Sequence, residues 1–401
     1  MSVVPGDAGN AARLLFVVTE DWAFLRHRLP MAKAALAMGL KVAVATRVSG
    51  HADAIRALGI EVFDTPVDRA GLSPIKDLRY LAHLARVFRR FRPDLIHNIA
   101  AKPVLYGTLA AKLAARQAGI INAFTGLGIL YTGDRDGRRS LKSRALGRLL
   151  TALLRGTCTS PRVHMLVQNP DDRDHLLANG IGRAEHSHLI PGSGVDLDQF
   201  PARPDPPAPP IRAVLVGRLL KTKGVVEFAE AAQILKDRGR DIHMILVGAP
   251  DADNPTSVTE AELQTWARAG IVEWPGESDD VAAVWANAHI AVLPSYREGL
   301  PKSLLEAAAS ARPMVATDVP GCRELVKDDE NGLLVPPGDA AALADAIEAL
   351  ATDSDKRNRF GDAARRSVEH TFSADAIGEK IAALYKAVLA EGGLSRPAGS
   401  A

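Results

Sequence analysis

Residues 212–225 read RAVLVGRLLKTKGV and place an apolar strand, a basic loop and the start of a helix in immediate succession. The strand is apolar without alternation after its first residue, which is typical of a strand covered on both faces of a sheet. The loop carries Arg218 and Lys223 between Gly217 and Gly224. A strand that passes through such a loop into a helix is the repeating unit of a parallel α/β sheet, so this stretch predicts that fold class.

The same alternation of strand and helix continues on both sides of this stretch. Strands are expected at 14–18, 41–46, 60–63, 94–97, 120–124 and 164–167, and then at 212–216, 243–247, 272–274, 290–293 and 314–317. Helical patterns lie between them, among others at 29–38, 52–58, 78–91 and 104–116. We therefore predict two Rossmann-like, doubly wound parallel sheets. Because open parallel sheets bind ligands beyond the carboxyl ends of their strands, a shared ligand is expected in an interdomain cleft.

A proline-rich segment separates the two series of strands. Residues 200–210 contain six prolines, which cannot continue a helix or an interior strand, so this segment is interpreted as a stiff linker. The expected organisation is a disordered N-terminus at 1–12, an N-terminal domain at 13–198, the linker at 199–211, a C-terminal domain at 212–372, a helix at 373–392 that packs back on the N-terminal domain, and a disordered tail at 393–401.

Composition excludes several classes of protein. The chain has 401 residues, of which 47% are apolar and 24% charged, as in ordinary globular proteins. Cys158 and Cys322 lie far apart and form no metal or redox motif, which fits a reducing compartment. The start of the chain does not resemble a secretory signal, and no apolar run approaches the roughly 18 residues of a membrane span. A cytoplasmic location is expected.

Charge is distributed unevenly between the two halves. Residues 1–200 contain 27 Lys and Arg against 17 Asp and Glu, a net +10, and residues 201–401 contain 22 against 30, a net −8. Such a split favours an anionic partner for the first half, although drift in surface charge would produce the same numbers.

Residues 297–307, REGLPKSLLEA, form the second chemically informative stretch. A helix start offers unpaired N–H groups and the positive end of a dipole, which suit a phosphate. Glu298 and Glu306 would repel phosphate but accept hydrogen bonds from the hydroxyls of a diol. Arg218 can present a fork of donors to phosphate oxygens, and Lys223 a mobile point charge. Together these groups predict a site for a sugar nucleotide.

Several motifs in order resemble one family. The motifs are GRLLKTKG at 217–224, SGVD at 193–196, Glu298 and Glu306 eight residues apart, RPMVATDVPGCRE at 312–324 and Asn331-Gly332. The chain resembles the retaining glycosyltransferases of family 4, which have the GT-B architecture, over about residues 13–390. RHRLP at 26–30, His97, KPVLYG at 102–107 and TGLG at 125–128 are most similar to the enzymes of capsule, O-antigen and exopolysaccharide synthesis.

The resemblance implies a hexosyltransferase that uses a nucleotide-sugar donor, most readily a UDP-sugar, with retention and without a required metal or other cofactor. Arg218, Lys223 and Glu298 would be the catalytic residues: the two cations would hold the diphosphate, and Glu298 the hydroxyls of the transferred hexose or N-acetylhexosamine. Glu306 would hold the ribose. The remaining donor-binding residues would be Gly217, Gly299, Leu300, Pro301 and, near the base, Trp274 and Gly276.

The implied acceptor is a polyprenyl-diphosphate-linked saccharide, and its site would include Arg26, His27, His97, Lys102 and Thr125. Many relatives have a histidine where this chain has Thr125, so a catalytic histidine is not expected there. The chain also reads TEDW at 19–22, where relatives have a glycine pair. His97 stands at a strand end, and the sequence leaves open whether it faces the acceptor or is satisfied in the core.

A basic segment at 134–162 indicates contact with an anionic membrane surface on the inner face of the plasma membrane. It contains eight Lys and Arg against two Asp, including Arg138, Arg139, Lys142, Arg144 and Arg148. Leu146, Leu149, Leu150, Leu153 and Leu154 would lie on one side of a helix, a pattern typical of interfacial helices. The alternative is that these leucines pack on the sheet. No nucleic-acid module accompanies the charge.

Three other functions compete with that of a glycosyltransferase. A sugar-nucleotide epimerase of the same architecture remains the main alternative, and it would need no second substrate. A nicotinamide oxidoreductase is disfavoured because TEDW follows the first strand in place of GxGxxG. A degenerate binding protein is disfavoured by the intact Arg218, Lys223, Glu298 and Glu306. Asp-x-Asp pairs at 134/136, 196/198 and 251/253 do not follow a long apolar strand of the first domain, so no metal site is predicted.

Overall fold

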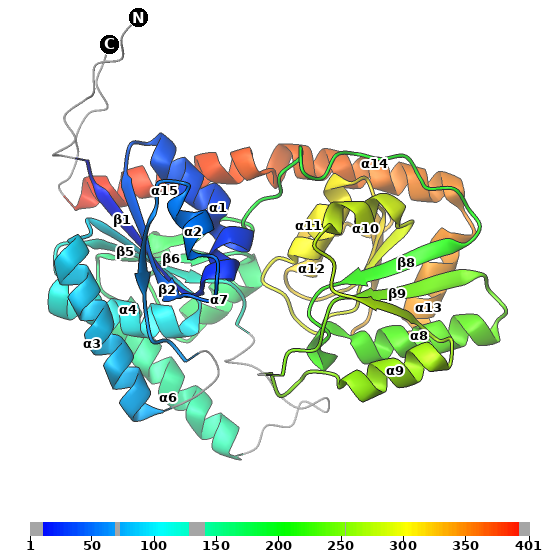
Figure 1. Cartoon of the computed structure of the whole chain (residues 1–401), viewed down its shortest axis with the longest axis horizontal. Coiled ribbons are helices and arrows are strands. Elements are labelled where there is room, and N and C mark those ends of the chain that lie inside the picture. The colour runs from blue at the N-terminus through cyan, green and yellow to red at the C-terminus, as the bar shows by residue number, and fades with distance from the viewer. Residues whose placement is uncertain (1–10, 69–72, 128–140, 253, 393–401) are drawn as a thin grey trace, which may run out of the picture. The chain divides into compact units, whose positions relative to one another are not determined.

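The structure, a computed structural model, describes residues 11–68, 73–127, 141–252 and 254–392, with 141–146 described by their backbone alone. The chain divides into two compact units (Figure 1). Unit 1 contains the residues up to Ser193 and those from Ile377 onward, and unit 2 contains Gly194–Ala376. Each unit contains one fully parallel sheet with helices on both faces. These are the two Rossmann-like sheets of the GT-B fold, as the sequence predicts.

Unit 1 is built around a seven-stranded sheet in the order β3-β2-β1-β4-β5-β6-β7. Its strands are β1 (Arg13–Glu20), β2 (Lys41–Arg47), β3 (Glu61–Asp64), β4 (Leu95–Ile99), β5 (Gly119–Phe124), β6 (Val163–Val167) and β7 (Ser187–Leu189). Its helices are α1 (Asp21–Ala37), α2 (Ala52–Arg56), α3 (Pro74–Phe91), α4 (Ala101–Ala114), α6 (Leu141–Cys158), α7 (Pro170–Ala178), the 3-10 turn η1 (Ala184–His186) and most of α15 (Ala374–Glu391).

Alternate residues of the strands serve the two faces of this sheet. Leu15 and Val17 of β1 pack with α3, α4 and α6, whereas Leu14, Phe16 and Val18 pack with α1 and α15. The apolar face of α15 is therefore part of the core of unit 1 rather than of unit 2. In Figure 1, α15 (red) and α1 (blue) lie beside the strands of this sheet.

Unit 2 contains a six-stranded sheet in the order β10-β9-β8-β11-β12-β13. Its strands are β8 (Ile211–Val216), β9 (Ile242–Val247), β10 (Glu273–Gly276), β11 (Ile290–Leu293), β12 (Met314–Thr317) and β13 (Gly332–Val335). Its helices are the 3-10 turn η2 (Lys221–Lys223), α8 (Val225–Asp237), α9 (Glu260–Arg268), α10 (Val281–Asn287), α11 (Lys302–Ala309), α12 (Cys322–Leu325), α13 (Ala340–Ala351) and α14 (Ser354–Thr371). Helices α8 and α13 cover one face, and α11 and α14 the other.

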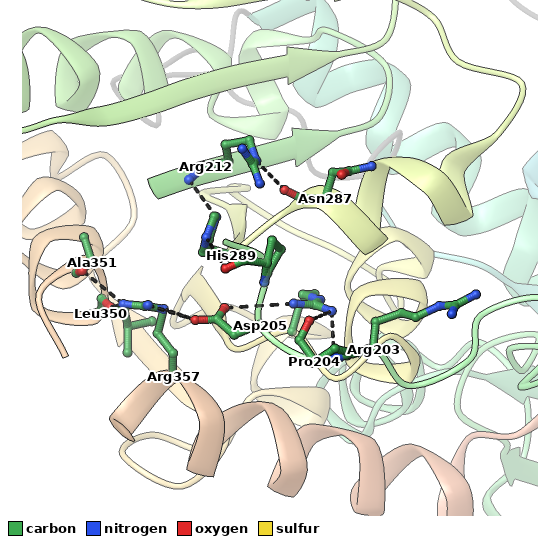
Figure 2. A network of polar contacts seen from close by, with 11 residues as sticks. Arg203, Pro204, Asp205, Arg212, Asn287, His289, Leu350, Ala351 and Arg357 are labelled. Carbon is green, nitrogen blue, oxygen red and sulfur yellow. Dashed lines mark hydrogen bonds and ion pairs between the residues drawn. The ribbon is translucent and has the colours of Figure 1, made fainter. Parts of the chain in front are cut away.

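The proline-rich segment is anchored on unit 2 by a polar network (Figure 2). Asp205 accepts hydrogen bonds from Nε and Nη2 of Arg357 at 3.1 and 2.8 Å. The buried Arg312 donates to the carbonyls of Arg203 and Pro204 at 2.7 and 2.9 Å, and His289 Nε2 lies 3.2 Å from the carbonyl of Pro206. Prolines have no N–H group, but their carbonyls still require donors when buried, and these arginine and histidine side chains supply them.

The boundary between the units consequently differs from the predicted linker at 199–211. Contacts divide the chain between Ser193 and Gly194. Beyond that point Val195 exchanges backbone hydrogen bonds with Phe372 and Ala374 at 3.0 and 2.8 Å, and Phe200 is buried in the core of unit 2. Composition identified the absence of helix and interior strand at 200–210, but it could not reveal which unit the segment packs against.

Two strands were not predicted, β7 and β13. Each is only three or four residues long and occupies the edge of its sheet. Among the described residues, no helix is both long and apolar enough to cross a membrane.

Candidate active site

The order of strands in unit 2 defines where a ligand should bind. The first strand of this unit, β8, is in the middle of the sheet, with β9 on one side and β11 on the other. The chain therefore leaves β8 and β11 in opposite directions around the sheet, which makes their carboxyl ends the topological switch point. The loops that follow these two strands contain Arg218, Lys223 and Glu298.

The loop after β8 depends on glycine. Gly224 adopts φ 73° as the residue before α8, and a Cβ atom there would collide with the carbonyl of Pro294, just beyond β11. The β8 loop is thus pressed against the end of β11. Gly217 has φ 155°, and a Cβ atom there would meet no described atom within 4 Å. Its constraint is the backbone conformation, and the space in front of it is open to a ligand.

Lys223 and Glu298 form the centre of the site. Lys223 Nζ lies 2.5 Å from Glu298 Oε1, and the same oxygen accepts a hydrogen bond of 2.6 Å from Ser295 Oγ. The Glu298 side chain is only 9% exposed, whereas Lys223 is 26% exposed. Burial with two donors fixes the carboxylate, because a buried carboxylate without such partners would be costly. Ser295 was not identified from the sequence, since a lone serine after a strand has no distinguishing pattern.

The loop that contains Glu298 also contacts the loop that follows β12. The backbone N–H of Glu298 donates to the carbonyl of Pro320 at 3.2 Å. Gly321 adopts φ 84°, and a Cβ atom there would come within 2.6 Å of the carbonyls of Glu298 and Gly299. The Pro-Gly pair at 320–321 is therefore required for close packing beneath the Glu-Gly-Leu-Pro loop, which gives a physical role to part of the motif at 312–324.

Arg218 lies at the exposed side of the same loop. Its guanidinium is 45% exposed and pairs with Asp251 Oδ2 at 2.7 Å. Asp251 follows β9 and was considered in the sequence only as half of an Asp-x-Asp pair. The structure gives it a different role, because it orients Arg218 at the switch point.

Glu306 lies on the second turn of α11, as the sequence predicts, and is 4% exposed. Lys302 Nζ, one turn earlier, lies 3.7 Å from Glu306 Oε1. The helix begins directly after Leu300 and Pro301, both buried, so its first N–H groups lie at the carboxyl end of β11. This combination of N–H groups, cations and carboxylates can bind phosphates beside hydroxyl groups.

Trp274 packs against the core of unit 2, which the sequence did not predict. Its indole Nε1 donates to the carbonyl of Gly248 at 2.8 Å, and its ring packs against the apolar core under α8. Gly276, with φ 88°, ends β10, and its carbonyl accepts from the Gly248 N–H at 2.8 Å. Placement of a base near Gly276 stays a prediction, and Trp274 primarily supports the edge of the sheet.

Unit 1 has the corresponding switch point between β1 and β4. Arg26 is exposed and His27 half-buried on α1, which follows β1 directly, and Thr125 is half-buried just after β5. Lys102, on the first turn of α4, pairs with Asp77 at 3.1 Å and donates to the carbonyl of Asp68 at 2.6 Å. These residues all follow carboxyl ends of strands, where an acceptor site is expected.

His97 is the exception among the predicted acceptor residues, because the structure places it inside the core. It has no exposed surface, and its ring lies between Phe16 and Tyr385, with Nδ1 2.8 Å from the Tyr385 hydroxyl. Burial, together with the charge of Arg28, lowers the pKa of His97 to about 3. Of the two possibilities that the sequence left open, the structure supports a neutral core histidine. It is buried because β4 is covered by α15, an element from the far end of the chain.

Arg28 is a candidate that the sequence analysis did not select. It is 8% exposed on the third turn of α1, and burial lowers the pKa of its guanidinium to about 10. It forms no ion pair with a carboxylate of the described residues. The nearest acids in sequence are occupied: Glu20 pairs with Arg47 at 2.7 Å, and Asp21 accepts from Ser49 and His51. A buried cation without an acidic partner is costly unless an anion binds to it. The burial of Arg28 is what makes it a candidate, and burial cannot be read from the sequence.

The basic helix α6 differs from the predicted pattern. Arg138 and Arg139 lie outside the described residues, and Lys142 and Arg144 lie in the part described by backbone alone. Arg148 is exposed, and Leu149 and Leu153 are 57% and 41% exposed. Leu150 and Leu154 instead pack on the sheet. The leucine stripe is therefore divided between the core and the surface.

Comparison with known proteins identifies the family. The model for glycosyl transferases group 1 matches residues 210–353, and the model for glycosyl transferase 4-like proteins matches residues 13–157. The chain is 28% identical to an N,N'-diacetylbacillosaminyl-diphospho-undecaprenol alpha-1,3-N-acetylgalactosaminyltransferase of Campylobacter jejuni over 94% of this chain and 99% of the relative.

Solved structures show the same fold. Sucrose-phosphate synthase from Thermosynechococcus elongatus superposes with a TM-score of 0.77 at 20% identity, covering 95% of this chain and 100% of that chain. Anabaena HepE in complex with UDP-glucose superposes with a TM-score of 0.72 at 19% identity, covering 94% and 99%. With two glycosyltransferase models on its two units and the GT-B fold throughout, the chain belongs to the group 1, family 4-like glycosyltransferases.

Proposed function

We propose that this glycosyltransferase moves a hexose or an N-acetylhexosamine from a UDP-sugar to a polyprenyl-diphosphate-linked saccharide, with retention, in the synthesis of a bacterial surface polysaccharide. The observation that supports this most is the Lys223–Glu298 pair at the switch point of unit 2, with Arg218 on the same loop. Cations beside a fixed carboxylate match the phosphates and hydroxyls of a sugar nucleotide.

The donor would use these groups in distinct ways. Lys223 and Arg218 would hold the diphosphate and stabilise the charge that develops on the departing UDP, a role for which fixed cations suffice without a divalent ion. Glu298, fixed by Ser295, would accept hydrogen bonds from the transferred sugar. Glu306 would accept from the ribose. The UDP-glucose in the HepE complex supports uracil as the base.

The acceptor would be bound by unit 1. The Campylobacter jejuni relative has a name that specifies a diphospho-undecaprenol-linked acceptor. A diphosphate needs cations, and Arg28 is a buried guanidinium without an acid partner among the described residues. Lys102, Arg26 and His27 follow carboxyl ends of strands in the same unit. We assign the acceptor diphosphate to Arg28 and Lys102, and its saccharide to the Arg26, His27 and Thr125 region.

The membrane surface would be met by α6. Leu149 and Leu153 lie one turn apart and are largely exposed beside the exposed Arg148. Apolar side chains next to arginines are the combination that enters the interface of an anionic bilayer. A lipid-linked acceptor would then be met where it resides, on the inner face of the plasma membrane.

The test is a two-substrate assay on the purified chain. UDP-glucose, UDP-galactose, UDP-N-acetylglucosamine and UDP-N-acetylgalactosamine are each offered with and without polyprenyl-diphosphate-linked N-acetylhexosamine, and UDP and glycolipid are quantified. We expect one donor to give UDP and an extended glycolipid in equal amounts, only when acceptor is present. Conversion of the donor into an epimer without acceptor would contradict the proposal and favour the epimerase alternative.

A further inference from the structure

Three histidines and one glutamate gather at the edge of unit 1 opposite the switch point. His164 is the second residue of β6, His188 lies on β7, His186 ends η1, and Glu391 is the last residue of α15. His164 Nε2 lies 3.2 Å from Glu391 Oε2, and the rings of His164 and His186 stack with centroids 4.5 Å apart. None of these residues belongs to a motif that stands out in the sequence.

The register of the sheet explains why these residues meet. Leu166 of β6 faces His188 of β7, so His164, two residues earlier on β6, points to the same side as His188. This is the side on which Ile381, Tyr385 and Val388 of α15 pack, and the end of that helix brings Glu391 to the ring of His164. Residues more than two hundred positions apart are thus collected at one point.

The distances suit a metal ion. His164, His186 and Glu391 each offer one ligand atom, and these three atoms all lie within 4.8 Å of one another. Zn²⁺ binds histidine nitrogen and carboxylate oxygen at about 2.0–2.2 Å, so neighbouring ligands of a tetrahedral site lie about 3.3 Å apart. The His164–Glu391 separation already has that value. A rotation of the half-buried His186 ring would bring in the third ligand.

The hydrogen bonds around the cluster leave the required atoms available. His164 Nδ1 lies 3.0 Å from His188 Nε2, so His188 can accept the second N–H of a ligating His164 and fix its orientation. His186 Nδ1 is buried and has no hydrogen-bond partner among the described residues. A ligating imidazole needs a nitrogen lone pair that faces the metal, and this pattern of contacts leaves one on His164 and one on His186.

We propose that His164, His186 and Glu391 bind one Zn²⁺ ion, with His188 as the partner that orients His164 and with water completing the coordination. The ion would join the end of α15 to β6 and η1. Because the cluster lies at the amino ends of the strands, the ion would stabilise the fold and take no part in sugar transfer. This proposal does not depend on the identity of the donor or acceptor.

Binding of zinc is measured on the full-length chain without an affinity tag, because a histidine tag would bind the metal itself. Calorimetry with Zn²⁺ and the visible absorption of Co²⁺ are compared for the wild type, His186→Ala and Glu391→Gln. His243→Ala serves as the control, because His243 also pairs with a carboxylate, Glu273, but has no third ligand among the described residues. Glu391 is 53% exposed, so its replacement by glutamine does not threaten folding.

We expect one Zn²⁺ per wild-type chain, a rise in melting temperature with Zn²⁺ that EDTA reverses, and a tetrahedral Co²⁺ spectrum. His186→Ala and Glu391→Gln should each weaken zinc binding by more than about tenfold, in line with the effect of losing even an outer partner of a ligand. His243→Ala should bind as the wild type does. Wild-type binding no tighter than that of the two variants would overturn the proposal and leave a hydrogen-bonded histidine cluster.

Discussion

The two units share the order of their first six strands but differ in how their charged side chains are paired. In unit 2, cations and carboxylates meet in pairs, Lys223 with Glu298 and Arg218 with Asp251. In unit 1, Glu20 and Asp21 are satisfied by Arg47, Ser49 and His51. Lys102 pairs with Asp77, whereas Arg28 is left without an acid among the described residues. A balanced site suits a ligand with both phosphates and hydroxyls, whereas an uncompensated cation suits an anion. The same topology therefore presents two different charge environments in the two units.

The largest effect is expected in unit 2 from Lys223→Ala. Loss of a fixed cation from the departing diphosphate should lower kcat by about 10²–10³-fold, comparable with removal of a preorganised donor elsewhere. Steady-state kinetics with saturating donor measure this loss. Lys221→Ala is the matched control, because Lys221 is 46% exposed on the same turn and pairs with Glu262. Equal kcat values for Lys223→Ala and Lys221→Ala would show that Lys223 does not act on the departing diphosphate.

The corresponding test in unit 1 is Arg28→Met. The acceptor KM should rise about 10- to 100-fold, because a charge-assisted contact to phosphate is lost. UDP-sugar affinity should not change. The melting temperature should stay the same or increase, because the variant no longer buries an unpaired charge. Lys33→Met, at an exposed position of the same helix, is the control. A lower melting temperature with an unchanged acceptor KM would show that Arg28 is purely structural.

Acid should destabilise unit 1 through His97. Its pKa is near 6.5 in the unfolded chain and about 3 in the folded one, so the unfolded state binds the proton first as the pH falls. The contribution of neutral His97 is complete above pH 6.5 and is lost progressively down to about pH 3. Acidification from pH 6.5 to pH 5 should therefore lower the free energy of unfolding by about 2 kcal/mol through His97.

Urea unfolding at pH 7 and pH 5 measures this dependence. His97→Gln should lose less stability on acidification than the wild type does, whereas replacement of the exposed His370 by glutamine should not alter the difference. If His97→Gln and the wild type lose the same free energy of unfolding between pH 7 and pH 5, His97 is not a buried neutral group in unit 1.

The smallest effect concerns the surface of unit 1. Replacement of Leu149 and Leu153 by serine should weaken binding to phosphatidylglycerol vesicles about tenfold, because the two half-exposed leucines together gain on the order of 1.4 kcal/mol from burial in the interface. Sedimentation with vesicles measures the binding. Leu58→Ser, at another exposed leucine of unit 1, should bind as the wild type does. Vesicle binding that survives the double replacement would refute the role of α6.

Local chemistry made much of the candidate site of unit 2 predictable. Each of the loops after β8 and β11 is contiguous in sequence with the strand before it and the helix after it. The spacing of glycine, arginine, lysine and glutamate within each stretch therefore indicates where these residues lie in the fold. The acceptor side is different. His97 stands at a strand end exactly as an acceptor residue would, yet α15 covers it, and Arg28 differs from its neighbour Arg26 only in the direction that it faces on α1.

The sequence by itself determined the two parallel sheets, the family and the charged residues of the loops after β8 and β11, because apolar periodicity and short-range motifs encode these features directly. Only the tertiary structure decided that residues 200–210 pack on unit 2, that Asp251 holds Arg218, that the leucine stripe of α6 is divided, and that Glu391 reaches His164. These features depend on contacts between segments distant in sequence. Such contacts follow from the packing of whole elements, which no local pattern records.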